Sequence, residues 1–171
     1  MKKIVLLAIM AVACAFGVSA QKFALVDMEY VLKNVPSYEM ANEQLNQLSL
    51  RWQKEVEKVS KDAEEMYKKY QADMVFLTDE QKKAREEEIV AKEKEAAELR
   101  NQYFGPEGEL YKKRQTLMKP IQHDVYNAVK KVAEERGLQA IFDRATSSDI
   151  IFASPRIDVS ADVLAKLGYS K

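Results

Sequence analysis

The sequence is poor in the residues on which cross-links, metal sites and most catalysis depend. It contains one cysteine, Cys14, and one histidine, His123. A lone histidine is weak support for a metal site or for acid–base catalysis, so we expect His123 at a partly exposed helix surface. No phosphate-binding loop, Cys/His cluster or nucleophile paired with a base can be recognised. We therefore predict a protein that is not an enzyme and has no catalytic residues, metal or cofactor.

The sequence also lacks an excess of either charge. Lysine and arginine together number 27, as do aspartate and glutamate, and charged residues make up 32% of the chain. A nucleic-acid-binding protein would favour a basic surface, so nucleic acid is not expected as a partner. A charged fraction this high indicates extended, solvated helices. The acidic run 86–88 has basic neighbours and is interpreted as a solvated face, not as a cation site.

The first 20 residues have the layout of a secretory signal peptide. Lys2 and Lys3 precede an apolar run that begins at Ile4, and small residues end at Ala20. The run is shorter than the roughly 20 residues that a membrane-spanning helix needs, so we predict a secreted protein that is cleaved after Ala20. Lipidation at Cys14 is the less favoured alternative, because the Ala-Val-Ala before it is a poor lipid-attachment motif. The cleaved chain has no cysteine for a disulfide and a net charge of −2, since 25 basic residues face 27 acidic ones.

Glycine and proline are absent from residues 37–77. Apolar residues recur there with a mean step of 3.6, which predicts one long, nearly straight amphipathic helix of about 60 Å. Ser37 is the expected N-cap, and Glu39 suits the first turn. The apolar stripe comprises Ala41, Leu45, Leu48, Trp52, Val56, Val59, Ala63, Met66, Tyr70, Met74 and Leu77.

The stretch MVFLTDEQ at 74–81 ends this helix and starts another. Thr78 can cap the second helix while Gln81 reaches back, which is a capping box. The chain should therefore reverse near 76–79 and return through a second helix that has few apolar positions. Folding the sequence back about Thr78 places Pro120 at the base of this hairpin, where a proline is poorly tolerated inside a helix. The same fold-back places Gly105 beside Trp52.

A kink at Gly105 would make room for the bulky Trp52. We expect Tyr103 and Phe104, which precede this glycine, to pack against Trp52 and not to line a binding cavity.

Both ends of the chain contribute to a separate body. Residues 22–28, 138–143 and 150–154 each indicate a short strand, and the last two are predicted to form a hairpin around a polar turn. A helix between 120 and 136 should end at Gly137 as its C-cap. A final helix is expected with Asp158 or Ser160 as its cap and an end near Gly168. Three short strands would leave exposed edges, so we expect the sheets of several subunits to pair.

The predicted fold class is α+β: a small β body with three short strands per chain, assembling across subunits, and a long antiparallel α-helical hairpin arm. The expected parts are the signal peptide at 1–20, a strand and short helix of the body at 21–36, and the arm at 37–119 with its tip near 74–79. The remainder of the body, with a helix, two strands and a C-terminal helix, is expected at 120–171.

Six stretches of the chain, taken in order, resemble the OmpH/Skp family of periplasmic chaperones. They are KFALVDMEYVL, VPSYEMANEQL, LRWQKEVEK, YFGPEGELYKKRQTLMKPIQ, VAEERGLQAIFD and DVSADVLAKLG. The resemblance implies a homotrimer with a β body, from which three helical hairpins hang and enclose a cavity. It also implies an ATP-independent holdase that binds unfolded outer-membrane proteins and passes them to the outer-membrane insertion machinery. Residues 39–100 carry 16 acidic and 12 basic residues, so the lipopolysaccharide and membrane attraction of strongly basic members is not carried over.

The alternative function is a structural periplasmic spacer or adaptor that uses its helical hairpins to dock a partner. Such a protein would need well-packed seams and a recognition tip, whereas a holdase would have loose apolar inner faces. The sparse apolar stripe on residues 80–100 favours the holdase.

Flexible methionine and amphipathic tyrosine suit adaptable contacts with an unfolded client. Such residues gather toward the end of the arm, and we predict a client-binding set there. Within it, Met74 and Leu77 would close the hairpin while Val75 and Phe76 face clients; alternatively, all four only lock the turn. The set comprises Met66, Tyr67, Tyr70, Met74, Val75, Phe76 and Leu77.

Overall fold

The computed structural model describes residues 22–147 and 149–169, so the predicted signal peptide and Cys14 lie outside the described residues. The chain divides into two compact units. The arm is Pro36–His123, and the body combines residues 22–35 with 124–169. Helix α5 (Glu109–Arg136) runs from one unit into the other.

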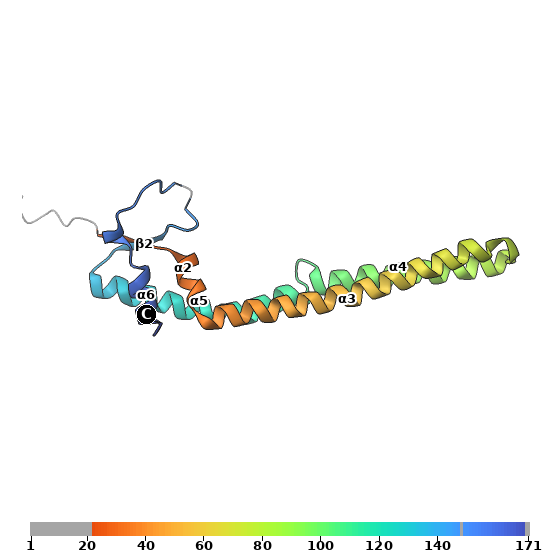
Figure 1. The fold of residues 1–171 in the computed structure, drawn as a ribbon, viewed down its shortest axis with the longest axis horizontal. Helices are drawn as coiled ribbons and strands as arrows, with labels where there is room; N and C mark the ends of the chain where they lie inside the picture. The colour runs from red at the N-terminus through yellow and green to blue at the C-terminus, as the bar shows by residue number, and fades with distance from the viewer. Residues whose placement is uncertain (1–21, 148, 170–171) are drawn as a thin grey trace, which may run out of the picture. The chain divides into compact units, whose positions relative to one another are not determined.

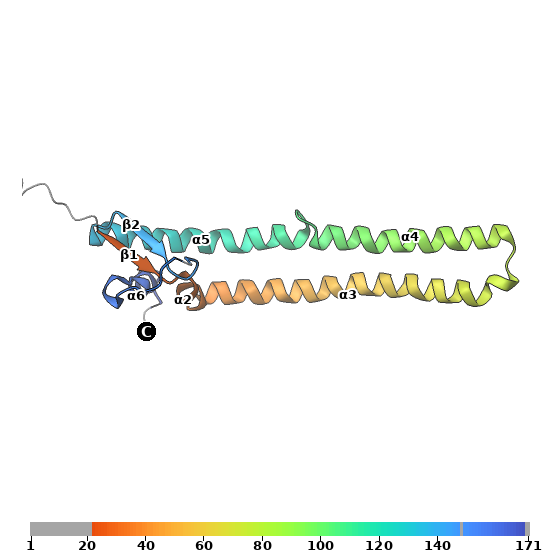
Figure 2. The same cartoon turned by 90° about the horizontal axis from the view of Figure 1, so that it is seen from above.

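The arm is a helical hairpin, as predicted. Helix α3 (Pro36–Asp73) leads into a short 3₁₀ turn, η1 (Met74–Phe76), and helix α4 (Asp79–Phe104) returns beside α3 (Figures 1 and 2). The helix starts at Pro36, one residue before the predicted cap Ser37, because proline in the first turn gives up no hydrogen bond. Its regular part ends at Asp73, four residues before the predicted end.

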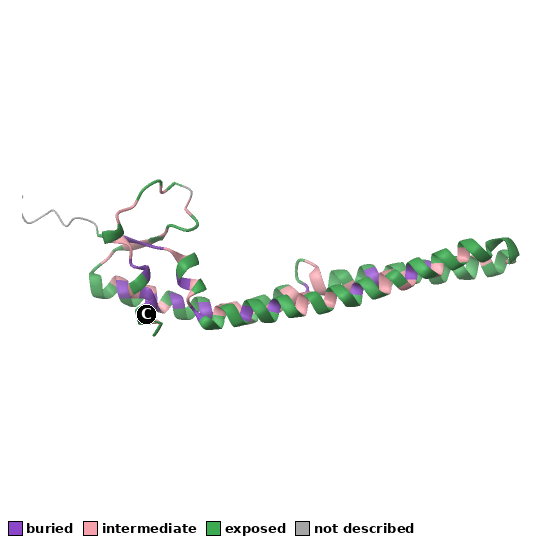
Figure 3. Cartoon of the chain, viewed as in Figure 1, coloured by how far each residue is buried: buried purple, intermediate pink, exposed green. Residues whose placement is uncertain are grey.

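The seam between α3 and α4 is narrow and built from small or medium side chains. The residues that it buries belong to the apolar positions predicted from the sequence, while most of the remaining surface is exposed (Figure 3). Ion pairs such as Lys61–Glu57 and Lys92–Glu95, both at 2.8 Å, lie along single helices and add little stability. The buried seam residues are Val56 and Ala63 of α3 with Ile89 and Ala96 of α4, and Ala41 and Leu45 are also buried toward the start of α3.

Two tyrosines tie the helices of the hairpin together. The Tyr70 hydroxyl donates to Glu86 of α4, and the Tyr103 hydroxyl of α4 donates to Glu55 of α3 at 2.6 Å. Each hydrogen bond, with desolvation and the nearby negative charge, raises the pKa of its tyrosine. These hydrogen bonds hold α3 and α4 side by side where few apolar residues are buried between them.

The turn at the tip has the predicted capping box. The Thr78 Oγ1 accepts the N–H of Gln81 at 3.3 Å, and the Gln81 side chain accepts the N–H of Thr78 at 2.9 Å. Two of the N–H groups that a helix start leaves unpaired are thereby satisfied.

The returning half of the helical hairpin is interrupted near Trp52. The sequence predicts a kink there, and the structure has a complete break between two helices. Helix α4 ends at Phe104 and α5 begins at Glu109. A Cβ on Gly105 would lie 2.4 Å from the Asn101 carbonyl oxygen, and a Cβ on Gly108 would lie 2.8 Å from a carbonyl oxygen, so this tight loop requires glycine at both positions. The Trp52 ring stacks on Tyr103 with centroids 4.8 Å apart and planes 8° apart. Packing of Tyr103 against Trp52 is thus confirmed.

Pro120 does not end a helix, which corrects the expectation drawn from its position. It lies inside α5, which continues to Arg136. The following turns bury Ile121, Val125 and Val132, which are 7%, 1% and 1% exposed. This apolar burial outweighs the hydrogen bond that proline cannot donate.

The body is built around a two-stranded parallel sheet. Strand β1 (Phe23–Val26) pairs with β2 (Ala140–Asp143) in the register Phe23 to Ala140. On the other edge of β1, Leu25 forms a single bridge with Asp158. The buried apolar residues of the body are Ala24, Leu25, Val26, Val31, Val35, Val125, Ala128, Val132, Val159, Val163 and Leu164.

The predicted third strand at 150–154 is not formed in this chain, and the predicted hairpin is replaced by parallel pairing of β1 with β2. The Asp143 carboxylate accepts the N–H of Ala145 at 3.0 Å and the hydroxyl of Thr146 at 2.7 Å. This turn leads the chain away from β2, and the chain later returns to the other edge of β1, where Asp158 bridges to Leu25.

A polar cluster joins three segments of the body that are distant in the sequence. Arg144 Nη2 lies 3.1 Å from Asp27 Oδ2 and 3.2 Å from Asp158 Oδ2. The Asp27 side chain also caps helix α2 (Met28–Lys33). Asp158 accepts the N–H of Ser160 at 2.8 Å at the start of helix α6 (Ser160–Lys166), whereas the buried Ser160 hydroxyl accepts the N–H of Asp27 at 2.8 Å. Neither predicted cap occupies the N-cap position, which is Val159 and has no side-chain cap; Ser160 is the first residue of α6, and Asp158 accepts the N–H of that residue from outside the helix.

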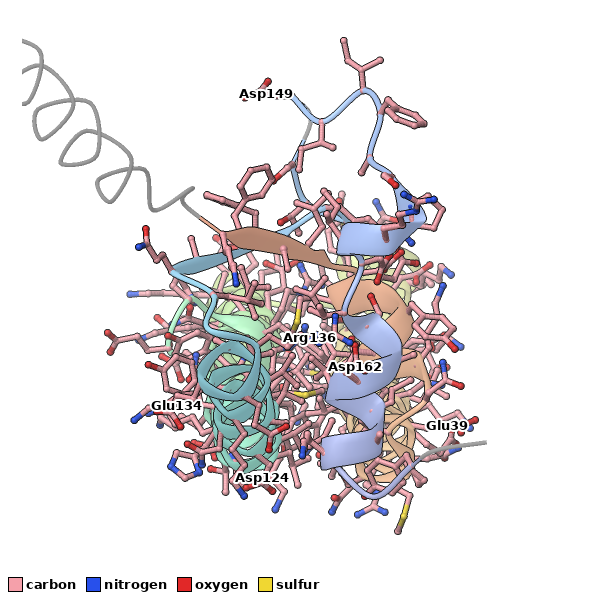
Figure 4. The ribbon with its side chains drawn as sticks, turned by 90° about the vertical axis from the view of Figure 1, so that its left-hand side faces the viewer. Glu39, Asp124, Glu134, Arg136, Asp149 and Asp162 are labelled. Carbon is pink, nitrogen blue, oxygen red and sulfur yellow. The ribbon has the colours of Figure 1, made fainter. Side chains whose placement is uncertain are left out.

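As predicted, a glycine with positive φ follows the end of α5 and another follows the end of α6. Gly137 has φ +62° after α5, and Gly168 has φ +86° after α6. Arg136 in the last turn of α5 forms an ion pair of 2.6 Å with Asp162 of α6 (Figure 4). Within the described residues, no helix is both long and apolar enough to cross a membrane.

Replacing Trp52 with alanine should destabilise the arm, because Tyr103 loses its stacking partner and the apolar contacts of the half-buried indole are removed. We expect a loss of about 2 kcal/mol in the free energy of unfolding, measured by urea titration with circular dichroism. Leu50→Ala is a matched control, since Leu50 is 45% exposed on the same helix. Equal effects of the two substitutions would contradict the role given to Trp52.

The body should lose stability in acid through Asp143. Burial by itself raises the pKa of this carboxyl, but hydrogen bonds from Thr146 and from the backbone of Ala145, Met28 and Thr146 outweigh it and hold the pKa below its usual value. A lowered pKa in the folded state stabilises the protein above the unfolded pKa of about 4, and this stability is lost as the pH falls through the folded value. Thermal melts should therefore show that the difference in Tm between the wild type and Asp143→Asn is larger at pH 7 than at pH 3. A pH-independent difference would refute this linkage.

Candidate functional site

The tip of the arm exposes an apolar turn. Val75 is 81% exposed and Phe76 is 87% exposed, whereas Leu77 is half-buried. This exposure fits the expectation that Val75 and Phe76 project outward. It favours that expectation over the alternative in which all four residues only lock the turn. Met74, expected to close the seam, is 46% exposed and does so only in part.

The backbone explains why these side chains face outward. Asp73 ends α3 without a side-chain cap, and η1 is a single turn that buries none of its residues. Leu77 is extended, with φ −90° and ψ 144°, and delivers the chain to the Thr78 cap. A chain that reverses within so few residues has no second layer to cover Val75 and Phe76.

The predicted residues behind the tip divide into two kinds. Met66 and Tyr70 are half-buried and, with Leu77 and Ile89, line a small cavity of about 70 Å³ between the helices. Tyr70 is held by its hydrogen bond to Glu86, so its first role is to close the hairpin. Tyr67 is 48% exposed and faces outward. The structure therefore brings Met66, Tyr70 and Leu77 together and leaves Tyr67, Met74, Val75 and Phe76 accessible.

The apolar tip has a charged border. The Asp79 side chain is fully exposed in the first turn of α4, where a negative charge is favourable beside the helix N-terminus. Lys82 lies 3.6 Å from it. A contiguous apolar surface rimmed by polar groups is typical of an interaction site.

A second exposed apolar surface lies in the body and was missed as a surface in the sequence. Phe23 and Phe142 meet edge to face with ring centroids 6.2 Å apart, and each is 52% exposed. Ile151 is 100% and Phe152 is 85% exposed, and the loop that carries them borders an open groove of about 750 Å³ with both phenylalanines. The run Ile150–Phe152 is the signal in the sequence, but its composition predicts a strand and not an exposed surface.

The weaker candidates have structural explanations. Glu86 accepts the Tyr70 hydroxyl, and Glu88 pairs with Arg85 at 3.0 Å, which fits a solvated face for the run 86–88. His123 is exposed on α5. Within 22–147 and 149–169, no group of three potential metal-ligating side chains is assembled.

The helical hairpin and the small parallel sheet define a class of protein with an extended two-helix arm on an α/β body. The family model for "Outer membrane protein (OmpH-like)" matches residues 22–167. The chain therefore belongs to the OmpH-like family. A comparison with curated proteins gives no match.

The fold is also similar to a crystal structure of an OmpH-like protein from Caulobacter crescentus CB15, which is proposed to be an outer membrane chaperone. The TM-score is 0.69 at 12% sequence identity, and the match covers 88% of this chain and 86% of that chain. At this identity the likeness concerns the fold alone.

Proposed function

We propose that this protein is an ATP-independent periplasmic holdase that binds unfolded outer-membrane proteins and prevents their aggregation before membrane insertion. The exposed tip formed by Met74, Val75 and Phe76 is the observation that carries the proposal. Membership of the OmpH-like family supports a chaperone role in general. In this proposal, the N-terminal 20 residues direct export, and the insertion machinery of the outer membrane receives the client.

The physical task of a holdase matches this surface. An unfolded client exposes apolar segments of variable sequence, so the holder needs apolar contacts that adapt and release. Methionine and aromatic side chains meet that need. Tyr67 and the residues of η1 offer such contacts without a shaped pocket that would select one sequence.

We further propose that the active form is a homotrimer assembled through the bodies. Phe23, Phe142, Ile151 and Phe152 leave a large apolar surface exposed in the single chain, and the outer edge of β2 has no partner strand among the described residues. If the same surface of other copies covered it, neither the apolar side chains nor the edge of β2 would remain exposed. Several arms would then surround one client.

A structural spacer or adaptor is the competing function, and the ordered turn at the tip favours it. The Thr78 capping box gives Val75 and Phe76 one defined presentation, which would suit docking on a single partner. The narrow seam favours the holdase, because a spacer needs stiff, well-packed helices.

The holdase proposal predicts a defined result in an aggregation assay. A urea-unfolded outer-membrane β-barrel protein is diluted into buffer without ATP, and light scattering is followed. The chain 21–171 should suppress scattering, with saturation near one trimer per client. Absence of suppression by a folded oligomer would remove this function for β-barrel clients and leave the spacer as the leading proposal.

The double variant Val75→Ser/Phe76→Ser should need about tenfold more protein for the same suppression, because two apolar contacts with the client are lost. Its Tm should equal that of the wild type, since both side chains are exposed. Met40→Ser is the control, as Met40 is 72% exposed at the other end of α3. A lowered Tm with unchanged suppression would assign these residues to the turn.

The double variant Ile151→Asp/Phe152→Asp should dissociate the trimer, because charges would enter an apolar contact. The molar mass measured by light scattering coupled to size-exclusion chromatography should fall from that of three chains to that of one. Tyr126→Asp is the control, since Tyr126 is 66% exposed in the body but does not line the groove. A trimer that survives the double substitution would exclude this surface as the interface.

A further inference from the structure

A groove on the shaft of the arm is separate from the tip and has its own chemistry. Its volume is about 410 Å³, and it lies between α3 and the end of α4. Val56, only 6% exposed, and the half-buried Phe104 supply its apolar surface. Its polar lining consists of Gln53, Glu57, Ser60 and Arg100. This volume is sufficient for an aromatic side chain.

The Phe104 ring is held in place by a chain of contacts. Tyr103 meets it edge to face, with centroids 6.3 Å apart and planes 82° apart. Tyr103 is itself fixed between the stacked Trp52 ring and its hydrogen bond to Glu55. Because Gly105 ends α4 immediately after Phe104, the ring lies at the edge of the helix break. The groove wall is therefore ordered before any ligand arrives.

The two charges at the groove differ in how they are satisfied. Glu57 is paired with Lys61 at 2.8 Å, so its negative charge is offset within α3. In the part of the chain that the structure describes, the Arg100 guanidinium has no ion pair or hydrogen bond. Arg100 and Phe104 are one helical turn apart on α4 and so lie on the same face. The groove thus presents an aromatic wall beside one uncompensated positive charge.

We infer that this groove binds client segments in which an aromatic residue is followed by an aspartate or glutamate. The client ring packs against Phe104 and Val56, and its carboxylate pairs with Arg100, whose planar guanidinium binds carboxylates in two-pronged fashion. This inference rests on the proposed function and adds a preference to it. The tip accepts apolar segments broadly, while the shaft groove selects the charge next to them.

Trp52, the only tryptophan in the chain, provides the test because it stacks on the residue that contacts Phe104. Capped hexapeptides that differ only in Phe-Asp or Phe-Lys are titrated into the protein, followed by Trp52 fluorescence and by calorimetry. The Phe-Asp peptide should bind about fivefold more tightly, as expected for one exposed ion pair. Arg100→Gln should abolish the difference. Arg51→Gln, next to Trp52 but outside the groove lining, should preserve it.

The outcomes separate the two proposals. Equal affinities for both peptides, or no binding by a protein that still suppresses client aggregation, overturn the groove and leave the holdase in place. Selective peptide binding without suppression of aggregation overturns the holdase and leaves the groove as a peptide site. Loss of the preference in Arg51→Gln also overturns the assignment to Arg100.

Discussion

The parallel pairing of β1 with β2 is the constraint on which the rest of the structure depends. It joins Phe23 to Ala140 and is reinforced where Arg144 bridges Asp27 and Asp158. Parallel strands cannot be joined by a tight turn, so the chain between them must leave and return. Here that connection is the hairpin of α3, α4 and α5. The arm is thus part of the connection between two neighbouring strands.

The two units stabilise themselves by different means. The body buries branched apolar residues such as Val31, Val125 and Val163, which are at most 1% exposed. The arm buries only a few alanine, valine, leucine and isoleucine side chains spread along its length, and it also relies on tyrosine–glutamate hydrogen bonds between its helices. A thin seam leaves side chains at the tip and in the shaft groove uncovered. The features that make the arm a weak folding unit are those on which the proposed binding of client chains depends.

Periodic and capping signals in the sequence were sufficient to predict the hairpin, because they are local. The 3.6-residue step, the Thr78–Gln81 box and Gly137 each act within one or two turns. The errors concern choices made in three dimensions. Residues 150–154 have strand-forming composition, but composition does not decide which edge is available, and the turn after Asp143 leads the chain away. Pro120 is tolerated because of burial that follows it in α5. The exposure of Phe23, Phe142 and Phe152 depends on the sheet order, which the sequence alone leaves open.

The register of β1 and β2 also determines the order in which the chain can fold. The Asp27–Arg144 contact closes a separation of 117 residues, whereas the contacts of the hairpin tip are among residues only a few positions apart. Closing a long loop costs more entropy than closing a short one, and pairings of distant residues form slowly. The first strand to be synthesised must therefore wait, unpaired, until nearly all of the chain has followed. A protein of this topology has to pass through a stage in which its own sheet edge and apolar residues are exposed.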